Sequence, residues 1–300
     1  MLDLPRLNLG AYSESCLARH CGVWAIDTEW FKTAWAMIRA GVPITLAASG
    51  SNSAIYAPTV LDTGVGIVPL IGPLMKGKSK YGGTDSRDAR RALRAVSQDN
   101  DVKSVLLYID SPGGTVAGTS ELAADVAELA KDKPVRAYIE DLGASAAYWV
   151  ASQANTITAN SAAMVGSIGT MLVVEDSSKA AENAGVAVHV ISSGKLKGVG
   201  VDGAPVTEEQ LNYLEGQIYG LNKLFTSAVA SGRGISVGDV SARWGDGRVM
   251  LADEAYSTGL VDNIASLDAT LEAMGRADHS TRRQKMDKKI RNAMQEMNLT

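Results

Sequence analysis

The sequence predicts a mixed α/β protein built on a mainly parallel sheet. From Val60 onward, short apolar runs alternate with amphipathic segments, which is the pattern of βαβ units. The clearest apolar run, residues 103–110, leads directly into SPGG, and an amphipathic segment at 116–132 follows it. No internal repeat is visible, and we expect a mainly parallel sheet whose strands are joined by helical crossovers.

The expected strands are short apolar runs bounded by turn residues. They lie at residues 64–72, 103–110, 135–140, 156–159 and 186–191. The last of them, VAVHVI, alternates small and branched apolar residues around a histidine. Each run is too short for a buried helix, so strand is the better assignment.

The expected helices carry an apolar stripe at helical spacing. They lie at residues 86–99, 116–132, 177–184, 207–234, 236–244 and 251–258. The segment at 207–234 is the longest, because Thr207 and Gln210 have the spacing of a capping box and Gly232 and Gly234 can end the helix.

Two segments flank the predicted main domain, which we place at residues 59–265. Residues 1–58 form an N-terminal extension, and residues 266–300 form a basic C-terminal tail. The extension is expected to pack on the main domain or on a neighbouring subunit through Trp30, Phe31, Trp35, Met37 and Ile38. The tail is either an amphipathic helix that binds a partner or a solvated end, and its apolar positions are Met286, Ile290, Ala293 and Met297.

Composition excludes several classes of protein. A net charge of −4 gives no overall case for nucleic-acid binding, which normally uses a basic domain. The N-terminus carries charged residues where a signal peptide needs an apolar stretch, and no run reaches the roughly 20 apolar residues of a membrane span. We therefore expect a cytoplasmic protein with no nucleic-acid partner and no membrane anchor.

The only cysteines are Cys16 and Cys21, with His20 between them. Such a group can begin a metal site, but structural zinc needs a fourth ligand and usually paired ligand spacing. Ordinary intracellular thiols are the better interpretation. We expect no metal and no other cofactor.

Two loops that follow strands have the composition of a ligand site. They are DSPGGT at 110–115 and DLGASA at 141–146, and small residues in both let a ligand approach the backbone closely. An anion suits such loops, either a phosphate or a developing oxyanion. Phosphate is the weaker choice because neither loop carries a nucleotide-binding glycine pattern. A turn that simply requires glycine also explains SPGG.

The position of Ser145 favours the second interpretation, in which the two loops bind a developing oxyanion. A serine on a sharp turn from strand to helix projects its hydroxyl into the site, and the N–H of Ala146 points into the same space. The N–H of Gly113 or Gly114 is a candidate for the second donor of an oxyanion hole. The alternative is an ordinary loop serine.

A nucleophilic serine needs a base, and the three histidines are poorly placed for that role. His20 lies in the extension, His279 in the tail and His189 inside an expected strand. Lysine is the other option, provided that burial keeps its amine neutral. Of Lys195 and Lys197, the second is followed by a glycine and is the better candidate for enclosure, so the first should face solvent.

The motifs together resemble the signal peptide peptidase (protease IV) family of serine peptidases, including its phage head-maturation branch. They are SPGG, GASAAYW at 143–149, GSIG at 166–169, SGKLK at 193–197 and GRVMLADEAYSTGLVD at 247–262. The resemblance implies the Clp protease/crotonase-like fold of repeated ββα and βαβ units. It also implies Ser145 as nucleophile, Lys197 as general base, Gly114 and Ala146 as oxyanion donors, and Ser167 as an orienting hydroxyl. One departure is Ser145-Ala146-Ala147, where many members have S-G-G; alanine retains the N–H that the oxyanion hole needs.

The resemblance also suggests partners. A chain without an anchor and with a basic tail looks most like the phage branch, which implies protein substrates, a homo-oligomer, and contacts with capsid, portal or scaffold proteins in the host cytoplasm or inside an immature capsid. The alternatives are degradation of peptides in a bacterium, a capsid assembly factor without catalysis, and an acyl-CoA enzyme of the crotonase type. Ser145 as nucleophile argues against the last.

Overall fold

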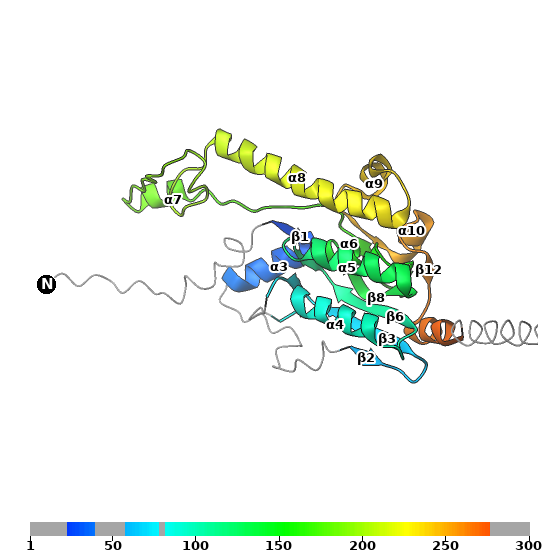
Figure 1. Cartoon of the computed structure of the whole chain (residues 1–300). Coiled ribbons are helices and arrows are strands. Elements are labelled where there is room, and N and C mark those ends of the chain that lie inside the picture. Colours follow the sequence, from blue (N-terminus) through cyan, green and yellow to red (C-terminus); the bar gives the residue numbers. More distant parts are fainter. Residues whose placement is uncertain (1–22, 40–57, 78–81, 277–300) are drawn as a thin grey trace, which may run out of the picture.

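The computed structural model describes residues 23–39, 58–77 and 82–276 of the chain. Its scaffold is an eight-stranded sheet in which β8 pairs with β6 on one side and with both β9 and β10 on the other (Figure 1). Its strands are β2 (Thr59–Val60), β3 (Val65–Ile71), β6 (Ser104–Ser111), β8 (Val135–Ala144), β9 (Thr156–Ala159), β10 (Met164–Gly166), β11 (Val249–Leu251) and β12 (Asn263–Ile264).

Most pairs in this sheet are parallel, and only β2 with β3 and β10 with β11 are antiparallel. The prediction of a mixed α/β fold with a mainly parallel sheet is therefore confirmed. A second sheet has the order β1-β7-β4-β5. Its strands are β1 (Trp24–Ile26), β4 (Leu74–Met75), β5 (Thr84–Asp85) and β7 (Gly113–Thr115).

The described helices include α3 (Thr28–Arg39), α4 (Ser86–Gln98), α5 (Thr119–Asp132), α6 (Ala146–Ala151), α7 (Ser178–Asn183), α8 (Glu208–Arg233), α9 (Val237–Trp244) and α10 (Ala252–Ser257). The six predicted helices are present in the predicted order, together with α3 and α6. The capping box of α8 is present: Gln210 N–H donates to Thr207 Oγ1, and the Gln210 side chain accepts from Thr207 N–H. Gly234 ends this helix in the left-handed conformation, as predicted.

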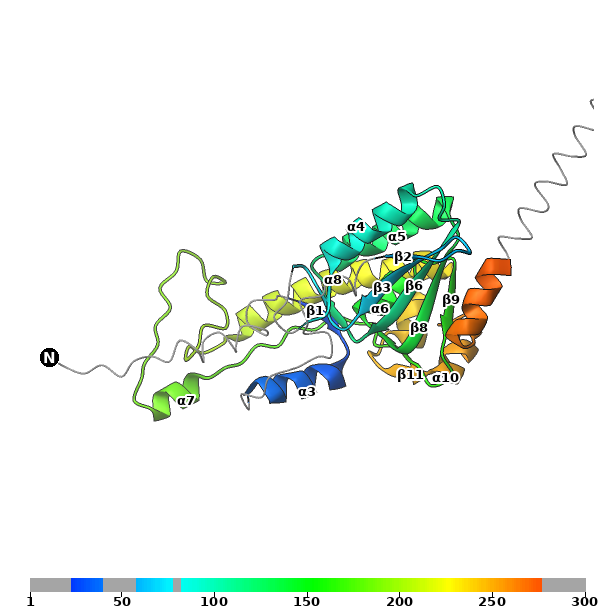
Figure 2. The ribbon, with the colours of Figure 1, turned by 90° about the horizontal axis from the view of Figure 1, so that it is seen from below.

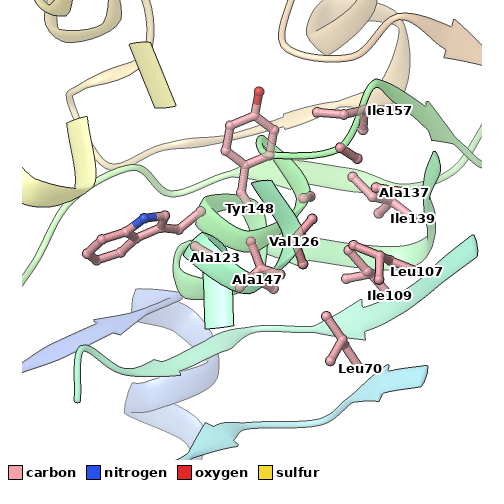
Figure 3. Packing of buried hydrophobic residues seen from close by; sticks show 14 of the residues in the cluster. Leu70, Leu107, Ile109, Ala123, Val126, Ala137, Ile139, Ala147, Tyr148 and Ile157 are labelled. Carbon is pink, nitrogen blue, oxygen red and sulfur yellow. The ribbon is translucent and has the colours of Figure 1, made fainter. Parts of the chain in front are cut away.

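The two faces of the large sheet are covered by different parts of the chain. Alternate residues of the central strands, such as Leu107 and Ile109, belong to the main core together with α4, α5, α6 and α8. In Figure 3, Ala147 of α6 and Val126 of α5 lie over these strand residues. The opposite residues pack against a helix that begins at residue 267, through Met274. The helical layers are seen on either side of the sheet in Figure 2.

One predicted strand is wrong. Residues 186–191 have no regular structure and lie in an arm, residues 172–206, that projects with α7 away from the sheets (Figures 1 and 2). Ile191 in this run is 97% exposed. The apolar pattern indicated burial, but no strand of the described residues lies beside it.

The N-terminal extension contributes to the fold of its own chain. β1 lies within the segment 1–58 and pairs with β7, so these residues pack on the main domain rather than only on a neighbour. The tail positions Met286, Ile290, Ala293 and Met297 lie outside the described residues, as do Cys16, His20, Cys21 and His279.

Phe225 attaches α8 to the helix that follows Ser145. Its side chain is fully buried, and its ring stacks on Trp149 of α6 with the centroids 4.8 Å apart. We expect Phe225→Ala to lower the free energy of unfolding by about 3–5 kcal/mol, because it leaves a large cavity. Urea denaturation measures this change. The control is Tyr256→Ala, whose side chain is 56% exposed, and an equal loss in both variants would contradict the assignment.

Candidate active site

Ser145 occupies the turn between β8 and α6. Its backbone has φ 55° and ψ −117°, a conformation that L-residues rarely adopt and that carries strain. Two hydrogen bonds hold the turn: Ser145 N–H donates to Gly166 O at 2.7 Å, and Trp149 N–H donates to Ser145 O at 2.8 Å. This is the strained strand-to-helix turn that the sequence predicts.

The hydroxyl of Ser145 is buried, and its oxygen has no hydrogen-bond partner among the residues that the structure describes. A buried hydroxyl without a partner costs about 1–3 kcal/mol, so such a group is uncommon in a purely structural position. The buried, unpartnered hydroxyl therefore makes Ser145 a candidate functional group.

Ser167 lies at the end of the neighbouring strand. β8 and β10 pair with Ala144 opposite Gly166, which brings the next residue of each strand to the same sheet edge. Ser167 is buried and has φ 53°, and its N–H donates to Arg248 O at 2.6 Å. Over residues 23–39, 58–77 and 82–276, it shares a positive φ with only one other non-glycine residue, Ser145.

The glycines of SPGG lie against this turn. A Cβ added to Gly113, whose φ is 94°, would be 2.8 Å from Ala146 N and 2.9 Å from Ala144 O. A Cβ on Gly114 would be only 1.8 Å from Leu74 O. Both positions therefore require glycine for close backbone approach, so β7 is brought into contact with the residues on either side of Ser145.

The three candidate oxyanion donors differ in availability. Gly113 N–H donates to Ser111 Oγ at 3.2 Å. Gly114 pairs with Ala25 of β1. Ala146 N–H is the first amide of α6 and has no acceptor inside the helix. Ala146 is therefore the candidate with no acceptor in its own element, whereas Gly113 and Gly114 are both engaged within the chain.

Lys197 is not brought to Ser145 within one chain. It lies in the arm, its side chain is exposed, and Figure 1 shows the arm projecting away from α6. Lys195 faces solvent as predicted, where its Nζ pairs with Glu209 Oε1 at 2.9 Å and this hydrogen bond raises the pKa of the amine. His189 is also exposed in the arm and does not contact the site.

A cavity of about 260 Å³ opens beside Ser167. The chain from Ser167 to Met171 forms one wall, and Ile26, Tyr219 and Asn222 contribute to others. The amide oxygen of Asn222 is buried and has no hydrogen-bond partner in the described part of the chain. The cavity therefore offers space and a polar acceptor next to Ser167.

Residues 127–297 match the sequence profile of Peptidase family S49. The chain belongs to peptidase family S49. The matched region contains Ser145, Ser167 and Lys197, whereas SPGG precedes it. S49 membership agrees with the observed α/β scaffold and confirms the family resemblance seen in the sequence.

Individual S49 relatives include cellular and phage proteins. A putative protease of Methanocaldococcus jannaschii is 35% identical over 63% of this chain and 61% of its own length. The capsid assembly protease C of Escherichia phage lambda is 29% identical over 70% of this chain and 48% of its own length. The head-tail preconnector protein GP5 of Enterobacteria phage P21 is 29% identical over 72% of this chain and 44% of its own length. The chain thus spans less than two thirds of these relatives.

Two features of the site were not predicted. The Ser111 hydroxyl donates to Gly72 O at 2.6 Å and accepts a hydrogen bond from Gly113 N–H. These two bonds hold the start of β7 in place. β1 pairs with β7 beside Ser145, although its three residues carry no strand signal of their own.

No helix in the described part of the chain is long and apolar enough to cross a membrane.

Proposed function

We propose that this chain is a serine endopeptidase in which Ser145 is the nucleophile and Lys197 is the general base. The observation that carries the proposal is the strained, buried Ser145, whose hydroxyl has no partner in the described chain. Membership of family S49 supports it. The proposed peptidase domain is residues 59–265, flanked by the extension 1–58 and the tail 266–300.

The proposed reaction proceeds through an acyl-enzyme. Lys197 Nζ takes the proton from Ser145 Oγ as this oxygen bonds to the peptide carbonyl carbon. The N–H groups of Gly114 and Ala146 stabilise the resulting oxyanion. The C–N bond then breaks as the ammonium returns the proton to the leaving amine, and water activated by the neutral lysine hydrolyses the ester. Ser167 orients the amine in this scheme.

The lysine is proposed to come from a second copy of the chain. Lysine acts as a base only when neutral, and desolvation favours that form, whereas the arm leaves Lys197 in solvent. The arm and the part of α8 up to Leu224 also expose a group of large apolar residues that is typical of an interface. They are Val173, Val186, Val190, Ile191, Leu196, Val201, Leu211, Tyr213, Tyr219 and Leu224. Burial of this surface in a homo-oligomer would enclose the lysine.

The proposed substrates are capsid or scaffold proteins that are processed during phage head assembly, in the host cytoplasm or inside the immature capsid. Support comes from the two phage relatives, one named a capsid assembly protease and the other a head-tail preconnector protein. The cellular relatives, such as the Protease 4 of Haemophilus influenzae at 28% identity, favour the second candidate, degradation of peptides in a bacterium. A capsid assembly factor without catalysis is the third.

Labelling with a fluorophosphonate tests the enzyme against the assembly factor. We expect the probe to modify wild-type protein at Ser145, located by mass spectrometry of the peptides. Ser145→Ala should abolish the label, whereas Ser161→Ala should keep it because that serine is exposed on the turn that follows β9. No label on the assembled wild-type protein, or a label that survives Ser145→Ala, would refute the proposed nucleophile.

A further inference from the structure

β1 is bonded along both of its edges, as a bound peptide would be. On one edge, Asp27 N–H donates to Pro112 O at 2.7 Å and Val116 N–H donates to Val23 O at 3.0 Å. On the other edge, Trp24 and Met171 exchange two hydrogen bonds of 2.9 and 2.8 Å. β1 therefore lies between SPGG and the segment that follows Ser167.

The carbonyl of Ala25 lies at the candidate oxyanion donors. Hydrogen-bonded pairs recur at every second residue of an antiparallel ladder, and the bonds at Asp27 and Val23 make Ala25 and Gly114 such a pair. Gly114 N–H thus donates to Ala25 O. The position of a Cβ on Gly113 is 2.4 Å from Ala25 O and 2.8 Å from Ala146 N, so this carbonyl also lies near the second donor.

We propose that β1 is an internal substitute for substrate, and that an extended peptide must displace it before cleavage. The inference rests on the proposed function. A carbonyl attacked by Ser145 needs the N–H groups of Gly114 and Ala146, and one acceptor already occupies Gly114. An incoming peptide would add as a strand antiparallel to β7 and would remake the bonds that β1 makes.

The side chains of β1 indicate the class of peptide that fits. Ala25 is fully buried and faces the main core, so the corresponding substrate residue must be small. Trp24 and Ile26 face the other way, into a separate cluster with Phe31. A substrate strand therefore carries a small residue at the reacting carbonyl, between two large apolar residues.

Side-chain contacts attach β1 to the main core mainly through the small residue Ala25. Its large side chains, Trp24 and Ile26, pack instead in a small separate cluster around Phe31, whose ring lies 5.7 Å from that of Trp24 and 5.8 Å from that of Trp35. Segments with few buried contacts open at a lower free energy than the core. Displacement of β1 therefore need not unfold the sheets.

A reversible disulfide tests the inference. Val23→Cys and Val116→Cys, in a background with Cys16→Ser and Cys21→Ser, place two thiols across a hydrogen-bonded pair, whose Cα separation of about 5.5 Å allows a disulfide. We expect the oxidised protein to react with a fluorophosphonate on the order of 10²-fold more slowly than the background, because a donor stays blocked. Reduction should restore the rate, and each single-cysteine variant should match the background.

A second pair of variants tests the opposite change, in which β1 is loosened rather than locked. Phe31→Ala should speed labelling because it loosens the cluster around β1, whereas Leu93→Ala, a substitution in α4 within the main core, should not. Equal rates for the oxidised and reduced proteins would overturn the inference while leaving the proposed function intact. Absence of labelling in the background protein would instead count against the proposed function.

Discussion

Lys197→Met is expected to lower the rate of peptide cleavage by about 10²–10⁴-fold, which is the usual contribution of a general base. Methionine keeps most of the length of the side chain and removes the amine. Lys195→Met is the matched control, because that lysine lies two residues away and pairs with Glu209 in solvent. Its turnover of a labelled casein substrate should stay close to that of wild type.

Co-expression distinguishes a lysine from the same chain from one that a second copy supplies. Chains carrying Ser145→Ala and chains carrying Lys197→Met should both be inactive alone, yet mixed oligomers should recover part of the activity. Recovery requires one intact serine and one intact lysine from different chains. Co-expression of Lys197→Met with the double variant, which has neither group, provides the control. No recovery despite mixed assembly would exclude the second copy as the source.

Ser145→Ala is expected to reduce turnover by at least about 10³-fold, as loss of a nucleophile does in other serine hydrolases. The same change should leave the free energy of unfolding unchanged or raise it by about 1 kcal/mol, because the lost hydroxyl is buried without a partner. Casein turnover and urea denaturation measure the two effects.

Ser152→Ala is the matched control for this pair of effects. Ser152 is equally buried, but its Oγ donates to Trp149 O at 2.7 Å and accepts from Gln153 at 2.8 Å. Its replacement should cost about 1–2 kcal/mol of stability and leave turnover near that of wild type. If the two variants lose stability equally and both remain active, Ser145 has only a structural role.

Local signals explain what the sequence predicted well. The caps of α8 and the small residues around Ser145 act over a few positions, so Thr207, Gln210 and Gly234 could be assigned, and the turn at Ser145 could be anticipated. The mainly parallel sheet followed from apolar runs that alternate with helices. These features depend on residues that are neighbours along the chain.

Contacts between distant residues explain what the sequence did not predict. β1 has three residues, and only its pairing with β7 makes it a strand. Residues 186–191 have the apolar pattern of a buried strand, but that pattern cannot show whether the residues that would bury it belong to the same chain. Lys197 lies in the arm, so its distance from Ser145 depends on where the arm packs, which the local sequence does not encode.

The projecting arm also bears on when the protein would act. With the proposed base held away from the proposed nucleophile, a solitary chain has an incomplete catalytic apparatus, and hydrolysis would rise more steeply than linearly as the chains become concentrated. Dilute, newly synthesised chains would then spare their surroundings. Under the proposal, confinement of many copies in a small volume would favour assembly and so raise the rate of hydrolysis per chain.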